Sequence, residues 1–125
     1  MASARNMVIA GDYQGCRIFC MTGKLAYISG TMKKMDDIFL TPEFVSRYEV
    51  MTEEIIRSGN SLLLTGVLDP GNLLKLRLHA TAAMQKKGIY TVALKFEDDK
   101  RSLLEVDEKT FRAIERRMAT AEESS

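Results

Sequence analysis

The sequence predicts an α+β domain in which a strongly bent antiparallel sheet, or a small barrel, is closed by a C-terminal helix. Two observations carry this prediction. Apolar residues alternate with other residues in several short runs over residues 7–28 and 89–106, which is the period of a β-strand. Residues 107–118 and 70–87 instead repeat apolar residues at helical spacing, which predicts the C-terminal helix and a second helix.

The first third of the chain has the pattern of β-hairpins. Cys16, Ile18 and Cys20 alternate with the residues between them, residues 22–24 can turn into a strand at 25–28, and residues 38–40 form another short apolar strand. If residues 16–20 are extended, the two cysteines lie about 13 Å apart, whereas a disulfide needs Cα atoms within about 7 Å. We therefore expect two reduced thiols in or near the core.

Residues 43–57 can be read in two ways. Thr41 as N-cap and Pro42 at the first helical position predict a helix start, and Phe44, Tyr48 and Met51 recur at helical spacing. Residues 45–52 also alternate, as a strand would. On periodicity alone, the helix is favoured.

Residues 60–88 follow a clear break at 58–61. Asp69 and Pro70 can begin a helix, the apolar residues beyond them lie at helical spacing, and Gly88 suits the position just past a helix C-terminus. Leucines also alternate with basic residues over 74–79, so a strand is the rival. The richness in Leu, Lys and Ala favours a helix near residues 70–87.

Residues 89–118 organise the predicted fold as a strand, a turn, a second strand and a capped helix. Residues 97–100 contain two aspartates and suit a hairpin turn. Asp107 is the predicted N-cap of the helix. The first strand is expected to place Tyr90, Val92, Leu94 and Phe96 on one face, and the partner strand continues with Ser102, Leu104 and Val106. The helix repeats Phe111, Ile114 and Met118 at helical spacing.

Composition describes one ordinary globular domain over residues 1–125, with flexible ends expected at 1–6 and 119–125. The net charge of +1 creates no global field, so nucleic acid is not an expected partner. No apolar run approaches the roughly 18 residues of a membrane span. The N-terminal apolar stretch is too short for a secretory signal, so a cytoplasmic location is expected.

Five segments of the chain form a recognisable combination: YEVMTEE at 48–54, YTVALKF at 90–96, RSLLEVD at 101–107, GDY at 11–13 and LTP at 40–42. Together they resemble a group of small uncharacterised proteins from Gram-positive bacteria and their phages. The resemblance implies a bacterial pleckstrin-homology-like (PH-like) fold, and it favours a strand over 45–53. The chain departs from the group at 60–88, where leucines alternate with basic residues instead of a Gly/Ala-rich stretch.

Candidate ligand-binding residues come from charge. Residues 70–96 contain five basic residues and no acidic one, which suits a phosphate, an acidic protein or an anionic membrane surface, and the alternative is a solvated helix face. Arg112 and Arg116 lie one turn apart on the last helix and could together bind a phosphate. The predicted set is Lys75, Arg77, His79, Lys86, Lys87, Arg112 and Arg116.

The function predicted from these observations is that of a non-enzymatic, homo-oligomeric binding module for a protein partner or an anionic small molecule such as a nucleotide. No catalytic set, metal site or cofactor motif is visible, and a phosphate-binding glycine loop is absent from the sequence. The resemblance to phage-carried proteins adds the hypothesis of an inhibitor of host defence. The alternatives are a membrane-surface adaptor using a basic amphipathic helix, and an enzyme without a recognisable motif.

Overall fold

The computed structural model of the chain describes residues 5–51 and 88–124. Its elements are the strands β1 (Met7–Gly11), β2 (Ile18–Met21), β3 (Leu25–Ile28), β4 (Ile38–Phe39), β5 (Val45–Val50), β6 (Ile89–Phe96) and β7 (Arg101–Asp107), the short 3₁₀ helix η1 (Thr31–Lys33) and the helix α3 (Glu108–Ser124). These elements confirm the predicted α+β class and the C-terminal helix.

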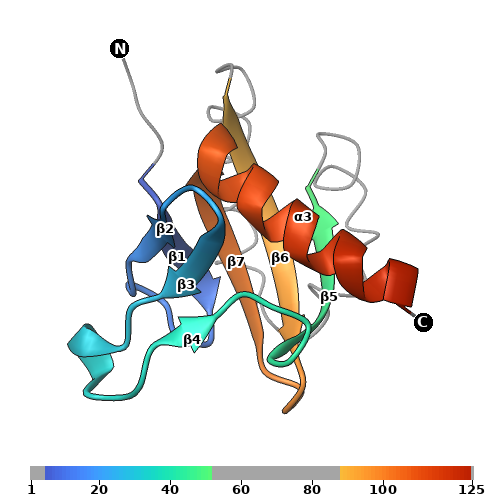
Figure 1. The fold of residues 1–125 in the computed structure, drawn as a ribbon. Coiled ribbons are helices and arrows are strands. Elements are labelled where there is room, and N and C mark those ends of the chain that lie inside the picture. Colours follow the sequence, from blue (N-terminus) through green and yellow to red (C-terminus); the bar gives the residue numbers. More distant parts are fainter. Residues whose placement is uncertain (1–4, 52–87, 125) are drawn as a thin grey trace.

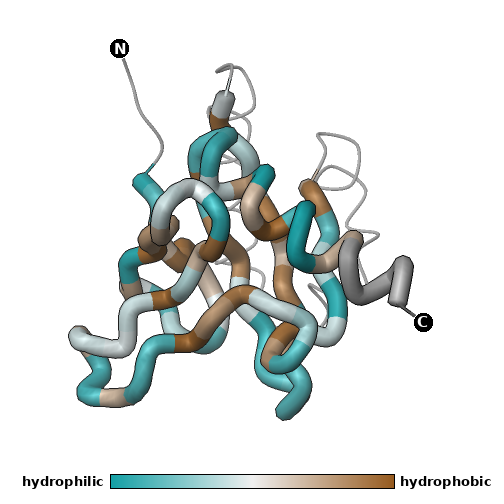
Figure 2. Tube along the Cα trace, viewed as in Figure 1, coloured by the Kyte–Doolittle hydropathy of each residue, from teal (hydrophilic) through white to brown (hydrophobic). Residues whose placement is uncertain are grey.

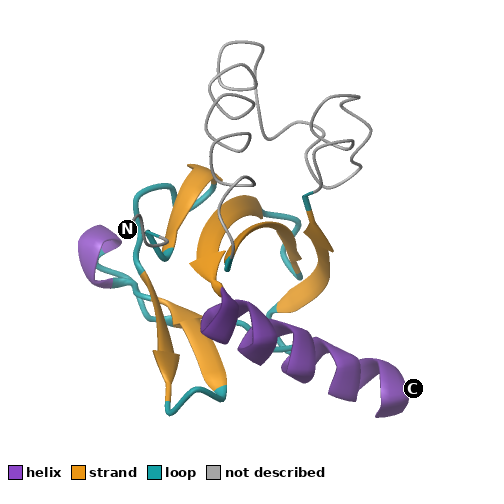
Figure 3. Ribbon diagram, turned by 90° about the horizontal axis from the view of Figure 1, so that it is seen from above, coloured by secondary structure: helices purple, strands orange, loops and turns teal. Residues whose placement is uncertain are grey.

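The strands form two antiparallel sheets (Figure 1). The larger sheet has the order β1-β7-β6-β5, and the smaller sheet has the order β2-β3-β4. Helix α3 packs on β6 and β7 of the larger sheet and on β2 and β3 of the smaller one. Figure 3 shows the larger sheet curved into an arc, with α3 running past its open side. In the described part of the chain an isolated bridge between Met7 and Arg17 links the two sheets, but they do not join into one closed barrel, so that alternative is not seen.

The core lies between the two sheets and α3. Figure 2 shows hydrophobic positions along the strands and hydrophilic ones in the connecting turns. The predicted apolar residues of α3, namely Phe111, Ile114 and Met118, are all buried in this core. Ile18 and Ile28 reach it from the smaller sheet. Burial of such side chains contributes roughly 1.5–3 kcal/mol each, so this cluster holds the helix to both sheets.

Strands β6 and β7 differ from the prediction in one respect. Their predicted core face is confirmed, because Val92, Leu94, Phe96, Leu104 and Val106 belong to the core cluster. Period-2 alternation over 89–96 predicts a strand that is buried on one face only, and this expectation is wrong. On the opposite face the cross-strand pairs Thr91–Glu105 and Ala93–Leu103 are buried as well. The alternation of residue types did not reveal this second buried face, because small or polar residues such as Thr91 and Ala93 can also be buried.

The turn and the helix start between β6 and α3 follow the predicted chemistry. Asp99 adopts a left-handed φ of 68°. The side chain of Asp98 accepts a hydrogen bond from the Lys100 N–H at 3.1 Å. The Asp107 carboxylate accepts the Thr110 N–H at 2.8 Å, which confirms it as the N-cap of α3. The helix continues beyond the expected end at Met118 to Ser124.

Residues 43–50 correct the helical preference drawn from periodicity. The helix-start residues make one turn only, in which the Thr41 carbonyl accepts the N–H groups of Phe44 and Val45 at 3.0 and 2.8 Å. The chain then extends as β5 and pairs with β6, with one irregularity between Val45 and Arg47. Pairing with β6 places Tyr48 and Val50 against the core, and this long-range contact outweighs the local helical signal.

The N-terminal hairpin and the thiols are as predicted. Strands β2 and β3 pair around the turn at 22–24, and β4 follows at 38–39. Cys16 is buried, Cys20 is half-buried against the core, and both are free thiols. Asn6, within the expected flexible start, exchanges hydrogen bonds with Asp107. The predicted second helix at 70–87 lies outside the described residues.

Candidate functional site

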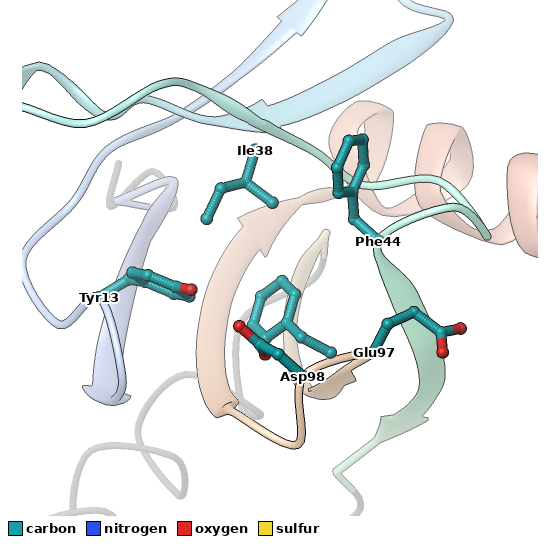
Figure 4. Close-up of a pocket in the computed structure, with 6 residues that line it drawn as sticks. Tyr13, Ile38, Phe44, Glu97 and Asp98 are labelled. Atoms are coloured by element: carbon teal, nitrogen blue, oxygen red, sulfur yellow. The ribbon is translucent and has the colours of Figure 1, made fainter.

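One hollow opens between the two sheets. It has a volume of about 210 Å³ and is lined by Tyr13, Ile38, Phe44, Phe96, Glu97 and Asp98. Figure 4 shows Tyr13, Ile38 and Phe44 reaching toward this common space from three different segments. The Tyr13 and Phe96 rings pack edge to face with centroids 5.4 Å apart. Because ligand pockets usually enclose about 300–1,000 Å³, this hollow is small for a ligand site.

The charges at its rim are already used within the fold. The Lys100 ammonium lies 3.6 Å from the Asp98 carboxylate and 5.4 Å from the centre of the Tyr13 ring. Hydrogen bonding to Tyr13, followed by the charge of Asp98, raises the pKa of Lys100 above its usual value. These groups tie the β6–β7 turn to residues 12–13, so the hollow is a packing feature.

A second and larger hollow lies on the outer side of the smaller sheet. Its volume is about 550 Å³, and it is lined by Gly15, Arg17, Phe19, Tyr27, Ser29, Thr31, Met32 and Asp37. The volume is that of a small-ligand pocket. Its lining combines a guanidinium group, three hydroxyls, two aromatic rings and one carboxylate. This mixture of apolar walls and a few polar groups makes it the candidate binding site.

Three aromatic rings continue from this hollow across the smaller sheet. Phe19 of β2 pairs with Tyr27 of β3, and Tyr27 pairs with Phe39 of β4, so the three side chains lie on one face. The ring centroids are 5.7 Å and 5.8 Å apart. Phe19 is 46% exposed and Phe39 is 37% exposed. We call Phe19, Tyr27 and Phe39 the aromatic row.

The strand register explains why these rings face solvent. Ile18, Ile28 and Ile38 occupy the neighbouring positions of the same three strands, and side chains of successive strand residues point to opposite faces. The isoleucines fill the core side, with Ile18 and Ile28 buried and Ile38 packed against them. The rings therefore lie on the outer side of the smaller sheet, away from the core.

The loop around η1 forms one wall of the candidate site. Its start is tightly built, because a side chain at Gly30 would collide with the backbone of Met35. The Gly30 N–H donates to the Asp37 carboxylate at 2.8 Å, and the Ser29 hydroxyl donates to the Thr31 hydroxyl at 3.2 Å. Asp37 thus has a structural role in closing the loop. Met32 at the tip stays 67% exposed beside the hollow.

The segment that contains β2, β3 and η1 is locally basic, and Asp36 and Asp37 follow it directly in the chain. Residues 13–35 contain four basic residues and no acidic one, and all four are exposed. They are Arg17, Lys24, Lys33 and Lys34. The ion pairs among the described residues engage Arg5, Lys95, Lys100 and Arg112 instead, so none of the four cations is paired within the described chain. We call these four residues the basic set.

Of the predicted ligand-binding residues, the structure describes two. Five of them, Lys75, Arg77, His79, Lys86 and Lys87, are outside the described residues. Arg112 and Arg116 are exposed on α3 and line neither hollow.

Arg112 already has partners on its own helix. It forms ion pairs with Glu115 at 3.0 Å and with Glu108 at 3.7 Å. The hydrogen bond to Glu115 is the main cause that raises the pKa of Arg112. A phosphate would have to displace these carboxylates, which weakens Arg112 as an anion ligand.

The candidate site was missed by reasoning from the sequence. The alternation over 16–21 predicted that Phe19 faces outward, but an isolated exposed ring is common. What marks the site is the alignment of three rings from three strands, and this depends on register. The run of basic residues at 17–34 without an acid was a usable signal.

Within residues 5–51 and 88–124, no three His, Cys, Asp or Glu side chains gather in a way that could hold a metal ion. The helices of this described part include none that is long and apolar enough to cross a membrane. Comparisons of the chain with protein-family models, curated proteins and solved structures found no match.

Proposed function

We propose that the protein is a non-enzymatic binding module whose ligand carries negative charge and docks on the outer face of the smaller sheet. The observation that carries this proposal is the position of Arg17 in the 550 Å³ hollow, beside Phe19 and Tyr27 of the aromatic row. An exposed guanidinium group without a carboxylate partner can pair with an anion at little cost in desolvation. The rings offer an apolar surface to the rest of the ligand.

The finer description of the fold belongs to the same proposal. A curved antiparallel sheet with a C-terminal helix against it is compatible with the PH-like fold that the sequence resemblance implies. Binding of an anionic ligand in the cytoplasm, as part of a phage-borne inhibitor that sequesters a nucleotide signal or blocks an effector, is the biological hypothesis that follows from that resemblance. Its alternative, a membrane-surface adaptor, rests on residues 70–87.

The test is a panel of anionic probes at low salt: ATP, inorganic triphosphate, a twelve-residue oligothymidylate and vesicles containing phosphatidylserine. We expect at least one probe to bind the full chain, with an affinity that falls as salt is added. Arg17→Glu should weaken that binding about tenfold or more. Arg47→Glu is the matched control, because Arg47 is an exposed cation on β5 of the larger sheet.

Each outcome is decisive. If no probe binds at low salt, or if the two charge reversals weaken binding equally, the proposed site is wrong. If only the vesicles bind, the membrane-surface adaptor replaces the small-ligand module. Thermal unfolding of both variants should match that of the unchanged chain, since both residues are exposed.

A further inference from the structure

We infer that the ligand of this face is a single-stranded nucleic acid, whose bases stack on the aromatic row while its phosphates contact the basic set. The inference rests on the proposed function and names its ligand class. The low net charge of +1 argued against nucleic acid as a partner, but the charge that a ligand meets is the local one.

The first argument is the geometry of the rings. Three neighbouring strands each present one ring on the same exposed face, with centroid separations of 5.7 and 5.8 Å. Flat sheets with exposed rings bind unpaired bases because every base has a π-face, so stacking tolerates any sequence. A duplex hides its base faces and would leave the rings unused.

The second argument is the position of the charges relative to the rings. Lys24 lies in the turn that joins β2 to β3, and Arg17 immediately precedes β2, so the two cations flank the row at opposite ends of the strands. Lys33 and Lys34 extend the charge along the η1 loop on the Arg17 side. A strand of phosphates that crosses the sheet therefore meets positive charge on both sides of the stacked bases.

The third argument concerns the rival occupant, a second copy of this chain. The exposed rings could also be buried in a homodimer. A two-fold symmetric interface places the same patch against itself, so it brings together the basic sets of both copies, which have no ion-pair partner among the described residues. Among the described residues that line the hollow, Asp37 is the one carboxylate. It could pair with one cation of a second copy, which leaves most of the basic set without a partner, whereas a polyanion offers a phosphate to each cation.

The experiment measures binding of fluorescently labelled twelve-residue oligothymidylate and oligouridylate to the full chain by anisotropy, across a salt series. We expect binding with a slope of log K against log salt of about −3, since each of four phosphate contacts contributes about −0.7. Arg17→Glu should make that slope shallower by about 0.7, which is the contribution of one phosphate contact.

Stacking is tested with Phe19→Leu and Phe39→Leu, which keep apolar area but remove the ring. Each should weaken oligonucleotide binding by about 5- to 150-fold, the range for loss of one base–aromatic stack. The matched control is Phe44→Leu. Phe44 is 39% exposed, like Phe39, but it borders the smaller hollow and lies outside the row. Unchanged thermal unfolding of all three variants confirms that they fold.

The outcomes separate this inference from the proposed function. Binding of ATP, triphosphate or vesicles without binding of either oligonucleotide overturns the nucleic-acid inference and leaves the anion-binding module standing. Failure of every probe overturns both. Equal affinity for a twelve-base-pair duplex, or equal effects of Phe19→Leu and Phe44→Leu, removes the stacking argument and with it the inference. Light scattering that shows a dimer broken by Phe19→Ser would assign the face to a second copy instead.

Discussion

The two sheets of this protein use their faces differently. In the larger sheet, β6 and β7 are buried on both faces, with Val92 and Leu94 toward the core and Ala93 and Leu103 on the opposite side. In the smaller sheet, one face is buried and the other presents Phe19 and Phe39 to solvent. Side chains of the first sheet are therefore held by packing on both faces, whereas the outer face of the second sheet leaves two aromatic side chains partly exposed to solvent.

The largest expected effect comes from a substitution in the packed core of the larger sheet. Leu94→Ala removes a fully buried side chain at the centre of β6 and should lower the free energy of unfolding by about 2–5 kcal/mol. Urea denaturation followed by circular dichroism measures this loss. A loss below about 1 kcal/mol would contradict the assignment of β6 to the centre of the core.

A second change should stabilise the same sheet. The hydroxyl of Thr91 is buried and has no hydrogen-bond partner among the described residues. An unpaired buried hydroxyl costs about 1–3 kcal/mol, and valine has nearly the same shape. Thr91→Val should therefore raise the free energy of unfolding by about 1 kcal/mol. Thr110→Val is the useful contrast because Thr110 is also buried, but its hydroxyl hydrogen-bonds to the Asp107 carboxylate, so this change should lower the free energy of unfolding. A similar loss for Thr91→Val would show that the Thr91 hydroxyl is satisfied.

The junction between the larger sheet and α3 should respond to acid. Asp107 lies between β7 and α3, and Asp107→Ala should cost about 1 kcal/mol at neutral pH through loss of the helix cap. Burial raises the pKa of Asp107. Hydrogen bonds from Thr110 and Asn6, with the charge of Lys109, outweigh that effect and hold the pKa below its ordinary value of 3.8. A lowered carboxylate pKa means that the stabilisation is complete above about pH 4 and is lost as pH falls through the folded-state pKa.

The control for this pH dependence is Asp107→Asn, which keeps a hydrogen-bond acceptor but cannot ionise. Thermal unfolding at a series of pH values should show the unchanged chain more stable at pH 7 and the two proteins converging at low pH. A constant difference over the whole range would show that the carboxylate charge has no part in the cap.

The smallest expected effect on stability is on the outer face of the smaller sheet. Phe19→Ser should change the free energy of unfolding by less than about 1 kcal/mol, because nearly half of the ring is already exposed. This is far below the loss expected for Leu94→Ala. A loss of similar size would mean that the aromatic row is part of the core, and the contrast between the two sheets would fail.

Local sequence determined those features whose chemistry is local. The Asp-rich turn at 97–100 and the N-cap Asp107 depend on side chains that bond to nearby backbone. The alternation over 16–21 correctly separated buried Cys16 and Ile18 from exposed Phe19. In the turn and the cap the interacting groups are close along the chain, and alternation follows from the strand backbone itself, in which successive side chains point to opposite faces.

Tertiary structure decided what depends on partners far along the chain. Residues 45–50 carry both periodicities, and pairing with β6 selected the strand. The burial of Thr91 and Ala93 depends on what covers a second face, which alternation cannot report. The aromatic row needs residues 19, 27 and 39 to fall in one register across three strands. Such alignment arises from backbone pairing, and for that reason the candidate site became visible only in the folded chain.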